Sequence, residues 1–165
     1  MELIVNVSEN WGIGLQGRLL FTISADLRRF RRLTEGKTVI LGRKTLQTFP
    51  GGRPLKNRRN LILSGSPDYA VDGAEVAHGL ADLKAALSPD EEAAVIGGAS
   101  VYELLLPYCA AARVTMTLQT VPADRFFPDL DRLPGWIRTA ASEVQEENGL
   151  RFRYLDYENT APLPL

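Results

Sequence analysis

Four short apolar runs predict β-strands that are buried on both faces, because none of them alternates with polar residues. Each run is followed by a serine or a glycine, which ends the strand; the runs are Leu3–Val7, Thr38–Leu41, Asn60–Leu63 and Ala93–Ile96. A weaker strand is expected at Glu75–Ala77. Continuous apolar strands are typical of a parallel sheet covered by helices, and we expect Leu3–Val7 to lie near its centre.

The stretch from Ser24 to Leu33 has helical spacing, with Leu27, Phe30 and Leu33 on one side and arginines on the other. Ser24 is the expected N-cap. Asp26 shares the apolar side, where an unpaired carboxylate is unfavourable, so a donor or cation should meet it. An acidic residue in the first helical turn can also be favoured by the helix dipole alone, which requires no ligand.

The last third of the chain changes from β-α units to antiparallel strands. Residues Arg113–Gln119 alternate as a strand, and the segments Trp136–Glu146 and Leu150–Tyr157 flank Asn148-Gly149, a strong hairpin signal. At 165 residues the chain has the length of one domain, spanning 1–165, with 159–165 expected to be a frayed tail. The pattern predicts an α/β sheet with an antiparallel edge.

Three segments that contain glycine are candidates for a part in ligand binding, the first as a lid and the other two as phosphate sites. Gly12, Gly14 and Gly17 match G-x-G-x-x-G, but the next helix cap comes only at Ser24, so we expect a mobile lid rather than a dinucleotide fingerprint. The turns that begin at Gly42 and at Gly97-Gly98 each join a strand to a helix and could approach phosphate closely. A solvated basic turn is the alternative for Arg43 and Lys44, which do not complete a P-loop motif.

Composition excludes several classes of protein. A net charge of -1 lacks the basic excess of nucleic-acid binding, and neither a leader nor a membrane segment is indicated. Cys109 and His78 are the single cysteine and the single histidine, which argues against a disulfide, a metal site of the usual zinc type and a Cys/His or Ser/His nucleophile. A cytoplasmic protein is expected, without nucleic-acid or membrane partners.

A series of motifs in fixed order resembles the dihydrofolate reductases over nearly the whole chain. The motifs are Gly12-Ile13-Gly14, Ala25-Asp26-Leu27 with Phe30, Val39–Thr45, Arg53-Pro54-Leu55 with Arg58, Leu61–Ser64, Ile96-Gly97-Gly98 with Val101-Tyr102, and Phe127-Pro128-Asp129. The resemblance implies a single-domain α/β fold: an eight-stranded, mostly parallel twisted sheet with an antiparallel C-terminal edge hairpin, flanked by four helices. It also implies reduction of 7,8-dihydrofolate to tetrahydrofolate by hydride from NADPH, in a monomer that antifolates could inhibit.

The resemblance assigns roles residue by residue. Asp26 matches the acid that binds the pterin and, with an ordered water, assists protonation of N5; Thr115 matches its hydrogen-bond partner, and Phe21 completes the catalytic set. The implied substrate-binding residues are Ile4, Val5, Asn6, Leu27, Phe30, Phe49, Arg53, Leu55, Arg58 and Ile96. The implied cofactor-binding residues are Asn6, Ile13, Gly14, Leu19, Gly42, Arg43, Lys44, Thr45, Leu63, Ser64, Gly65, Gly97, Gly98, Ala99, Ser100, Val101 and Tyr102. Asp124 matches a residue that holds the lid near Gly14 and Gln16.

The chain departs from the family pattern at three positions. Leu20-Phe21 stands where Pro-Trp is common, Asn6 replaces a small apolar residue, and Ser100 replaces an arginine that some members carry. Two alternatives therefore stay open: an NADPH-dependent pyrimidine reductase of riboflavin synthesis, and a catalytically idle nucleotide-binding paralogue. The first would not need Asp26 or Arg58, and retention of Asp26 with Thr115 argues against the second.

Overall fold

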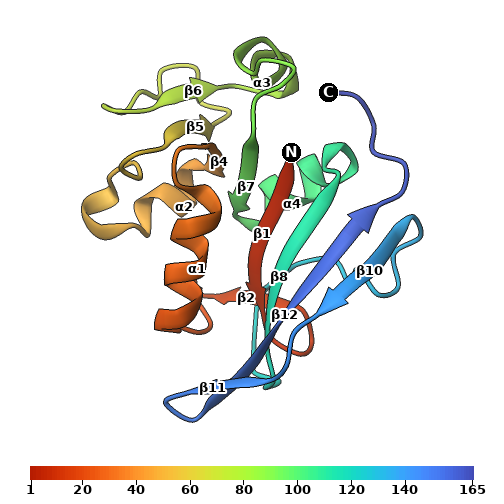
Figure 1. Cartoon of the computed structure of the whole chain (residues 1–165). Helices are drawn as coiled ribbons and strands as arrows, with labels where there is room; N and C mark the ends of the chain where they lie inside the picture. The colour runs from red at the N-terminus through yellow and green to blue at the C-terminus, as the bar shows by residue number, and fades with distance from the viewer.

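The computed structural model describes residues 1–165 and has one main sheet (Figure 1). Eight of its nine strands follow the order β10-β12-β8-β1-β7-β4-β5-β6, and the ninth, β11, pairs with β12 beside this path. The strands are β1 (Glu2–Val7), β4 (Thr38–Gly42), β5 (Arg59–Leu63), β6 (Glu75–Ala77), β7 (Ala93–Gly97), β8 (Ala111–Thr117), β10 (Trp136–Ala141), β11 (Gln145–Glu147) and β12 (Leu150–Asn159). Strand β1 lies between β7 and β8, which confirms its predicted central place.

The six neighbouring strands β6, β5, β4, β7, β1 and β8 pair in parallel. Strand β12 pairs antiparallel with β8, β10 and β11. Four α-helices flank the sheet: α1 (Ser24–Thr34), α2 (Arg43–Gln47), α3 (Leu80–Ala86) and α4 (Ala99–Leu105). Single turns of 3-10 helix lie at Pro50–Gly52 and Leu106–Tyr108. The predicted α/β fold with its antiparallel edge is therefore confirmed. None of the helices is long and apolar enough to span a membrane.

Buried side chains on the two faces of the sheet form two separate cores. Leu3, Val5 and Val7 of β1 belong to the larger core, while Ile4 between them belongs to the smaller one. This alternation follows from the two-residue period of a strand. Side chains from α3 and α4 pack into the larger core, and side chains from α1 and α2 pack on the smaller one. The helices therefore cover opposite faces.

The first turn of α1 differs from the prediction. Ser24 is the first helical residue and not the N-cap; Ile23 takes the cap position and offers no side-chain hydrogen bond. The carboxylate of Glu147 accepts hydrogen bonds from the backbone N–H groups of Ser24, at 2.6 Å, and Ala25, at 3.1 Å. A residue more than a hundred positions away therefore supplies the missing acceptor, which local sequence could not reveal.

The glycine-rich segment after β1 forms a small second sheet. Strands β2 (Gly12–Leu15), β3 (Arg18–Leu19) and β9 (Arg125–Phe126) pair in the order β3-β2-β9. We did not predict these strands, because they are short and β2 contains two glycines, which weaken a strand signal. The segment expected to act as a lid, Gly12–Phe21, is thus paired with a distant part of the chain.

The C-terminal segment is a hairpin with an interrupted first strand. Asn148 and Gly149 join β11 to β12 with φ of 51° and 80°, as a two-residue hairpin turn requires. The single strand expected at Trp136–Glu146 is divided into β10 and β11. The final residues also differ from a frayed tail: the Leu163 N–H donates to Pro107 O at 2.9 Å, and Leu165 packs against the larger core.

Candidate functional site

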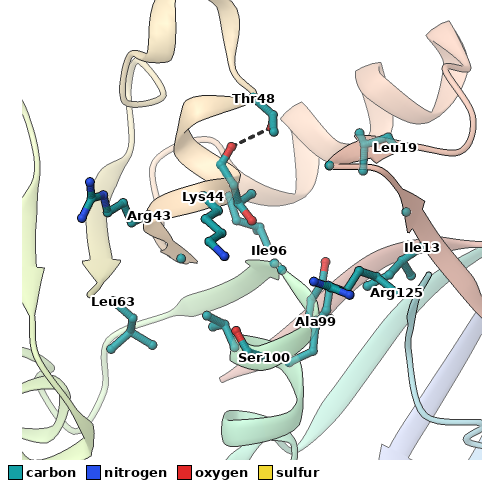
Figure 2. Close-up of a pocket in the computed structure, with 18 of the residues that line it drawn as sticks. Ile13, Leu19, Arg43, Lys44, Thr48, Leu63, Ile96, Ala99, Ser100 and Arg125 are labelled. Carbon is teal, nitrogen blue, oxygen red and sulfur yellow. Dashed lines mark hydrogen bonds between the residues drawn. The ribbon is translucent and has the colours of Figure 1, made fainter. Parts of the chain in front are cut away.

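A cavity of about 780 Å³ opens where strands β1, β4, β5 and β7 end (Figure 2). Parallel strands present their carboxyl ends at one edge of a sheet, and ligand sites of α/β folds form there. Every residue implied as cofactor-binding lines this cavity, as do three implied substrate-binding residues, Val5, Asn6 and Ile96. The cavity therefore collects turns that are widely separated in the sequence.

Glycines lie where the turns after β4 and β7 approach each other. A Cβ built on Gly98 would lie 3.1 Å from Thr45 Oγ1, and one built on Gly42 would lie 3.2 Å from Val101 Cγ2. Gly97 has a φ of 133°, which side-chain-bearing residues rarely adopt. A larger residue at Gly42 or Gly98 would be tightly packed against Val101 or Thr45, and one at Gly97 would be strained, so glycine suits this part of the cavity wall.

Cationic side chains surround the cavity without acidic partners. Arg43 and Lys44 begin α2, and Arg43 lies over the ring of Tyr69 at 4.8 Å instead of in an ion pair. Figure 2 shows Lys44 and Arg125 reaching into the cavity from different walls. Such unpaired cations favour an anionic ligand.

Asp26 lies at a second, small cavity of about 50 Å³ whose wall includes Phe21 and Leu27. The two cavities share Asn6, Ile13 and Leu19, so they adjoin. Leu27, expected to point inward, lines this cavity but is 53% exposed.

Two donors hold the half-buried Asp26 carboxylate. Thr115 Oγ1 donates to Oδ1 at 2.5 Å, and Asn6 Nδ2 donates to Oδ2 at 3.0 Å. Asn6 and Thr115 are paired residues on neighbouring strands β1 and β8, so the sheet places both donors side by side. The predicted Asp26–Thr115 pair is present, and the bond from Asn6 was not foreseen.

The remaining apolar substrate candidates lie on the face of the sheet that carries α1. Ile4 and Ile96 belong to the smaller core, and Phe30, Phe49 and Leu55 pack against it. Tyr102 belongs to the larger core on the opposite face and contacts strand β1, where its hydroxyl donates to Ile4 O at 2.7 Å. Burial, reinforced by the negative charge of Asp26, raises the pKa of Tyr102, so this hydroxyl stays protonated.

The two candidate arginines of the basic loop line neither cavity. Arg58 is held by Nη1 donating to Thr34 Oγ1 at 3.0 Å and by Nε donating to Lys56 O at 2.8 Å. Burial lowers the pKa of Arg58 below its ordinary value, with the nearby Glu35 opposing this effect. Arg53 is exposed. The structure thus orients Arg58 and leaves Arg53 at the surface.

Four further cavity residues were not predicted from the sequence: Arg18, Thr48, Ser66 and Arg125. They belong to short strands and turns without periodicity, and only the pairing of β2 with β9 brings Arg125 to the cavity. Asp124 does contact the lid as expected: its Oδ2 accepts from the Gln16 N–H at 3.0 Å, and its own N–H donates to Gly14 O at 2.9 Å.

Comparison with known proteins gives the same result from sequence and from structure. The family model for dihydrofolate reductase matches residues 1–159. The chain is 35% identical over 158 residues to the dihydrofolate reductase of Neisseria meningitidis serogroup B, covering 95% of this chain and 96% of the relative. It is 32% identical over 160 residues to that of Bacillus subtilis, covering 96% and 94%. A solved dihydrofolate reductase from Enterococcus faecalis, complexed with NADP(H) and RAB-propyl, superposes with a TM-score of 0.83 at 33% identity, covering 95% of this chain and 94% of that chain. A strand-end cavity, an acid held by a threonine and this likeness over nearly the whole length lead to one conclusion: the chain belongs to the dihydrofolate reductase family.

Proposed function

We propose that this protein reduces 7,8-dihydrofolate to 5,6,7,8-tetrahydrofolate with a hydride from NADPH. The observation that carries the proposal is the Asp26 carboxylate, which lines the small cavity and is held by Thr115 and by Asn6, a residue that lines both cavities. A pterin presents an N–C–NH₂ edge with two parallel donors, which a single carboxylate can accept through both oxygens. An acid that only stabilised its helix through the dipole would not need two donors from the sheet.

The larger cavity fits a dinucleotide. Its volume of about 780 Å³ lies within the range of ligand sites, and glycines at Gly42, Gly97 and Gly98 permit close approach of the backbone. Arg43 and Lys44 would hold the phosphate of the adenosine half, and Ser64 adds a hydroxyl at the same wall. When bound, NADPH supplies the hydride.

The protein's own residues would orient the substrate and assist its protonation. The single histidine, His78, lines neither cavity, so Asp26 is the titratable group placed to stabilise a protonated substrate. Phe21 and Leu27 line the small cavity beside the acid, where they would pack against a bound substrate. Arg58, oriented by Thr34, would pair with the carboxylate of the substrate's glutamate tail.

An absorbance assay tests the proposal directly. Adding dihydrofolate to the protein and NADPH should lower the nicotinamide absorbance, and Asp26→Asn should lose most of this rate at neutral pH. Oxidation of NADPH with a ribosylated aminopyrimidine instead of dihydrofolate would favour the riboflavin-type reductase. Binding of NADPH without turnover of either substrate would indicate an idle paralogue.

A further inference from the structure

Asn6 is a polar side chain in an otherwise apolar central strand. Its neighbours on β1 are buried, and Asn6 itself is half-buried between Asp26 and the fully buried Thr117. Placing an amide there is unfavourable unless it is hydrogen-bonded, so its partners indicate why it is tolerated. Thr117 Oγ1 donates to Asn6 Oδ1 at 3.1 Å, and Asn6 Nδ2 donates to Asp26 Oδ2 at 3.0 Å.

The direction of this chain of hydrogen bonds follows from the acid. An ionised carboxylate can only accept, so the NH₂ group of Asn6 must face Asp26 and its carbonyl must face Thr117. The Thr117 hydroxyl then donates to that carbonyl and prevents the amide from turning over. Thr117 and Thr115 are two residues apart on β8 and share one side of the strand. Thr115 therefore contacts Oδ1 of the acid directly, while Thr117 holds Asn6, the donor to Oδ2.

The two donors restrict rotation of the carboxylate. The terminal torsion of an aspartate is broad, so a single hydrogen bond from Thr115 to Oδ1 would leave the plane of the group loosely defined. A second donor on Oδ2 removes that freedom. A carboxylate has about four lone-pair positions, and one on each oxygen then stays available for a ligand.

We propose that Asn6 is a positioning residue that sets the plane of the Asp26 carboxylate for two-point recognition of the substrate's N–C–NH₂ edge, with Thr117 fixing the Asn6 amide from behind. This inference rests on the proposed function, because it assumes that Asp26 receives the pterin. It assigns a role in substrate affinity to Thr117, which lines neither cavity and cannot touch a ligand in either of them.

Thr117 provides the decisive variant because it acts only through Asn6. Thr117→Val keeps the shape of the side chain and removes the hydroxyl, whereas Thr117→Ser keeps the hydroxyl as a matched control. Loss of one neutral hydrogen bond corresponds to about a 2- to 10-fold change in an equilibrium constant. We expect Thr117→Val to raise the Kd and KM for dihydrofolate by that factor and to leave the KM for NADPH within about 2-fold. Thr117→Ser should stay close to the wild type.

A double-mutant cycle then tests the route through the acid. Dihydrofolate binding is measured by quenching of tryptophan fluorescence in the wild type, Thr117→Val, Asp26→Asn and the double variant, so that turnover is not needed. If the effect passes through Asp26, Thr117→Val should add nothing once the carboxylate is gone. Asn6→Ala supplies a second variant if Thr117→Val folds poorly, and it should weaken dihydrofolate binding by about 10-fold.

The outcomes separate this inference from the proposed function. Full activity of Asp26→Asn would contradict the function itself. Loss of activity in Asp26→Asn with unchanged dihydrofolate binding in Thr117→Val would overturn the inference alone. Equal weakening of dihydrofolate and NADPH binding, or the same loss in Thr117→Ser, would show a merely structural role and also overturn it.

Discussion

At the residue scale, Asp26 differs from an ordinary acid of a first helical turn. Its two oxygens accept from Thr115 and Asn6, which belong to two strands of the sheet and not to the helix. The dipole of α1 would be satisfied by an exposed carboxylate with no such partners. These contacts connect the helix to the sheet at the point where the two cavities meet.

Asp26→Asn should therefore alter the pH dependence of hydride transfer. The amide keeps the size of the side chain but lacks the charge that stabilises a protonated substrate. We expect a loss of about 10²- to 10⁴-fold at neutral pH. The rate of the variant should climb as the pH falls, because acid supplies substrate that is already protonated in solution. Single-turnover kinetics of both proteins from acid to neutral pH measure this, and parallel profiles would exclude the role.

Lys44 should determine the preference for NADPH over NADH. It reaches into the larger cavity and forms no ion pair within the protein, so a phosphate is its natural partner (Figure 2). One charge-assisted contact is worth about 1.5 to 3 kcal/mol, or about 10- to 150-fold. Lys44→Met should lower kcat/KM for NADPH by that factor and leave NADH nearly unchanged, while Lys84→Met on α3 serves as a charge-matched control. A wild-type protein that used both cofactors equally would contradict the prediction.

At the scale of elements, the pairing of β2 with β3 and β9 holds the lid segment in a defined arrangement. Asp124 contributes two of the contacts, to Gln16 and Gly14. Asp124→Ala should slow hydride transfer in single-turnover experiments, because a loosened lid admits water to the site. The side-chain contact with Gln16, which this variant removes, is exposed, so the free energy of unfolding should change by no more than about 1 kcal/mol. Asp68→Ala, in another exposed turn, is the control, and unchanged transfer rates would show that the lid is not held there.

The hairpin of β11 and β12 stabilises α1 from a distance. Glu147 occupies the place of an N-cap by accepting from Ser24 and Ala25, directly before Asp26. Glu147→Ala should lower the free energy of unfolding by about 1 kcal/mol, the usual effect of losing a cap. It should also weaken dihydrofolate binding, because the first turn of α1 carries the acid. Glu146→Ala removes a neighbouring exposed carboxylate and should change neither the free energy of unfolding nor dihydrofolate binding. If both variants lowered stability and binding equally, capping by Glu147 would be contradicted.

At the scale of the whole molecule, one ion-pair network joins four segments at an edge of the sheet. Arg59 of β5 contacts Glu75 of β6 at 2.6 Å and Glu91, which precedes β7, at 2.7 Å. Thr38 of β4 also donates to Glu91. The Arg59 bond lowers the pKa of Glu75, and the Thr38 bond, followed by other contacts, lowers the pKa of Glu91. Both carboxylates are therefore more stable as anions in the folded state.

This network predicts a loss of stability in acid. A carboxylate with a lowered folded-state pKa contributes fully above its ordinary value of 4.5, and that contribution is lost as the pH falls below it. Urea unfolding at about pH 7 and about pH 3 should show the decrease. Glu91→Gln should lower stability at neutral pH and reduce the difference between the two conditions. Glu146→Gln, at an exposed carboxylate, should leave the difference in unfolding free energy between the two pH values as in the wild type. The same wild-type difference in Glu91→Gln would contradict the prediction.

The sequence alone determined the parallel strands of the main sheet, the helix that carries Asp26 and the order in which they follow one another. Continuous apolar runs such as Leu3–Val7 can be stable only between covering helices, and Asn148-Gly149 favours a tight hairpin locally. The resemblance of the motif series to the dihydrofolate reductases also implied most of the residues that line the larger cavity. These features can be recognised in the sequence because each depends on residues that are close together along the chain.

Only the tertiary structure decided the contacts between residues far apart in the chain. Glu147 caps α1, Arg125 reaches the cavity through β9, and Thr117 orients Asn6 against Asp26. None of these residues carries a local signal, since glutamate, arginine and threonine are common in exposed strands and turns. Their roles depend on the register between β1 and β8 and on the pairing of β2 with β9, which side-chain packing sets over the whole molecule.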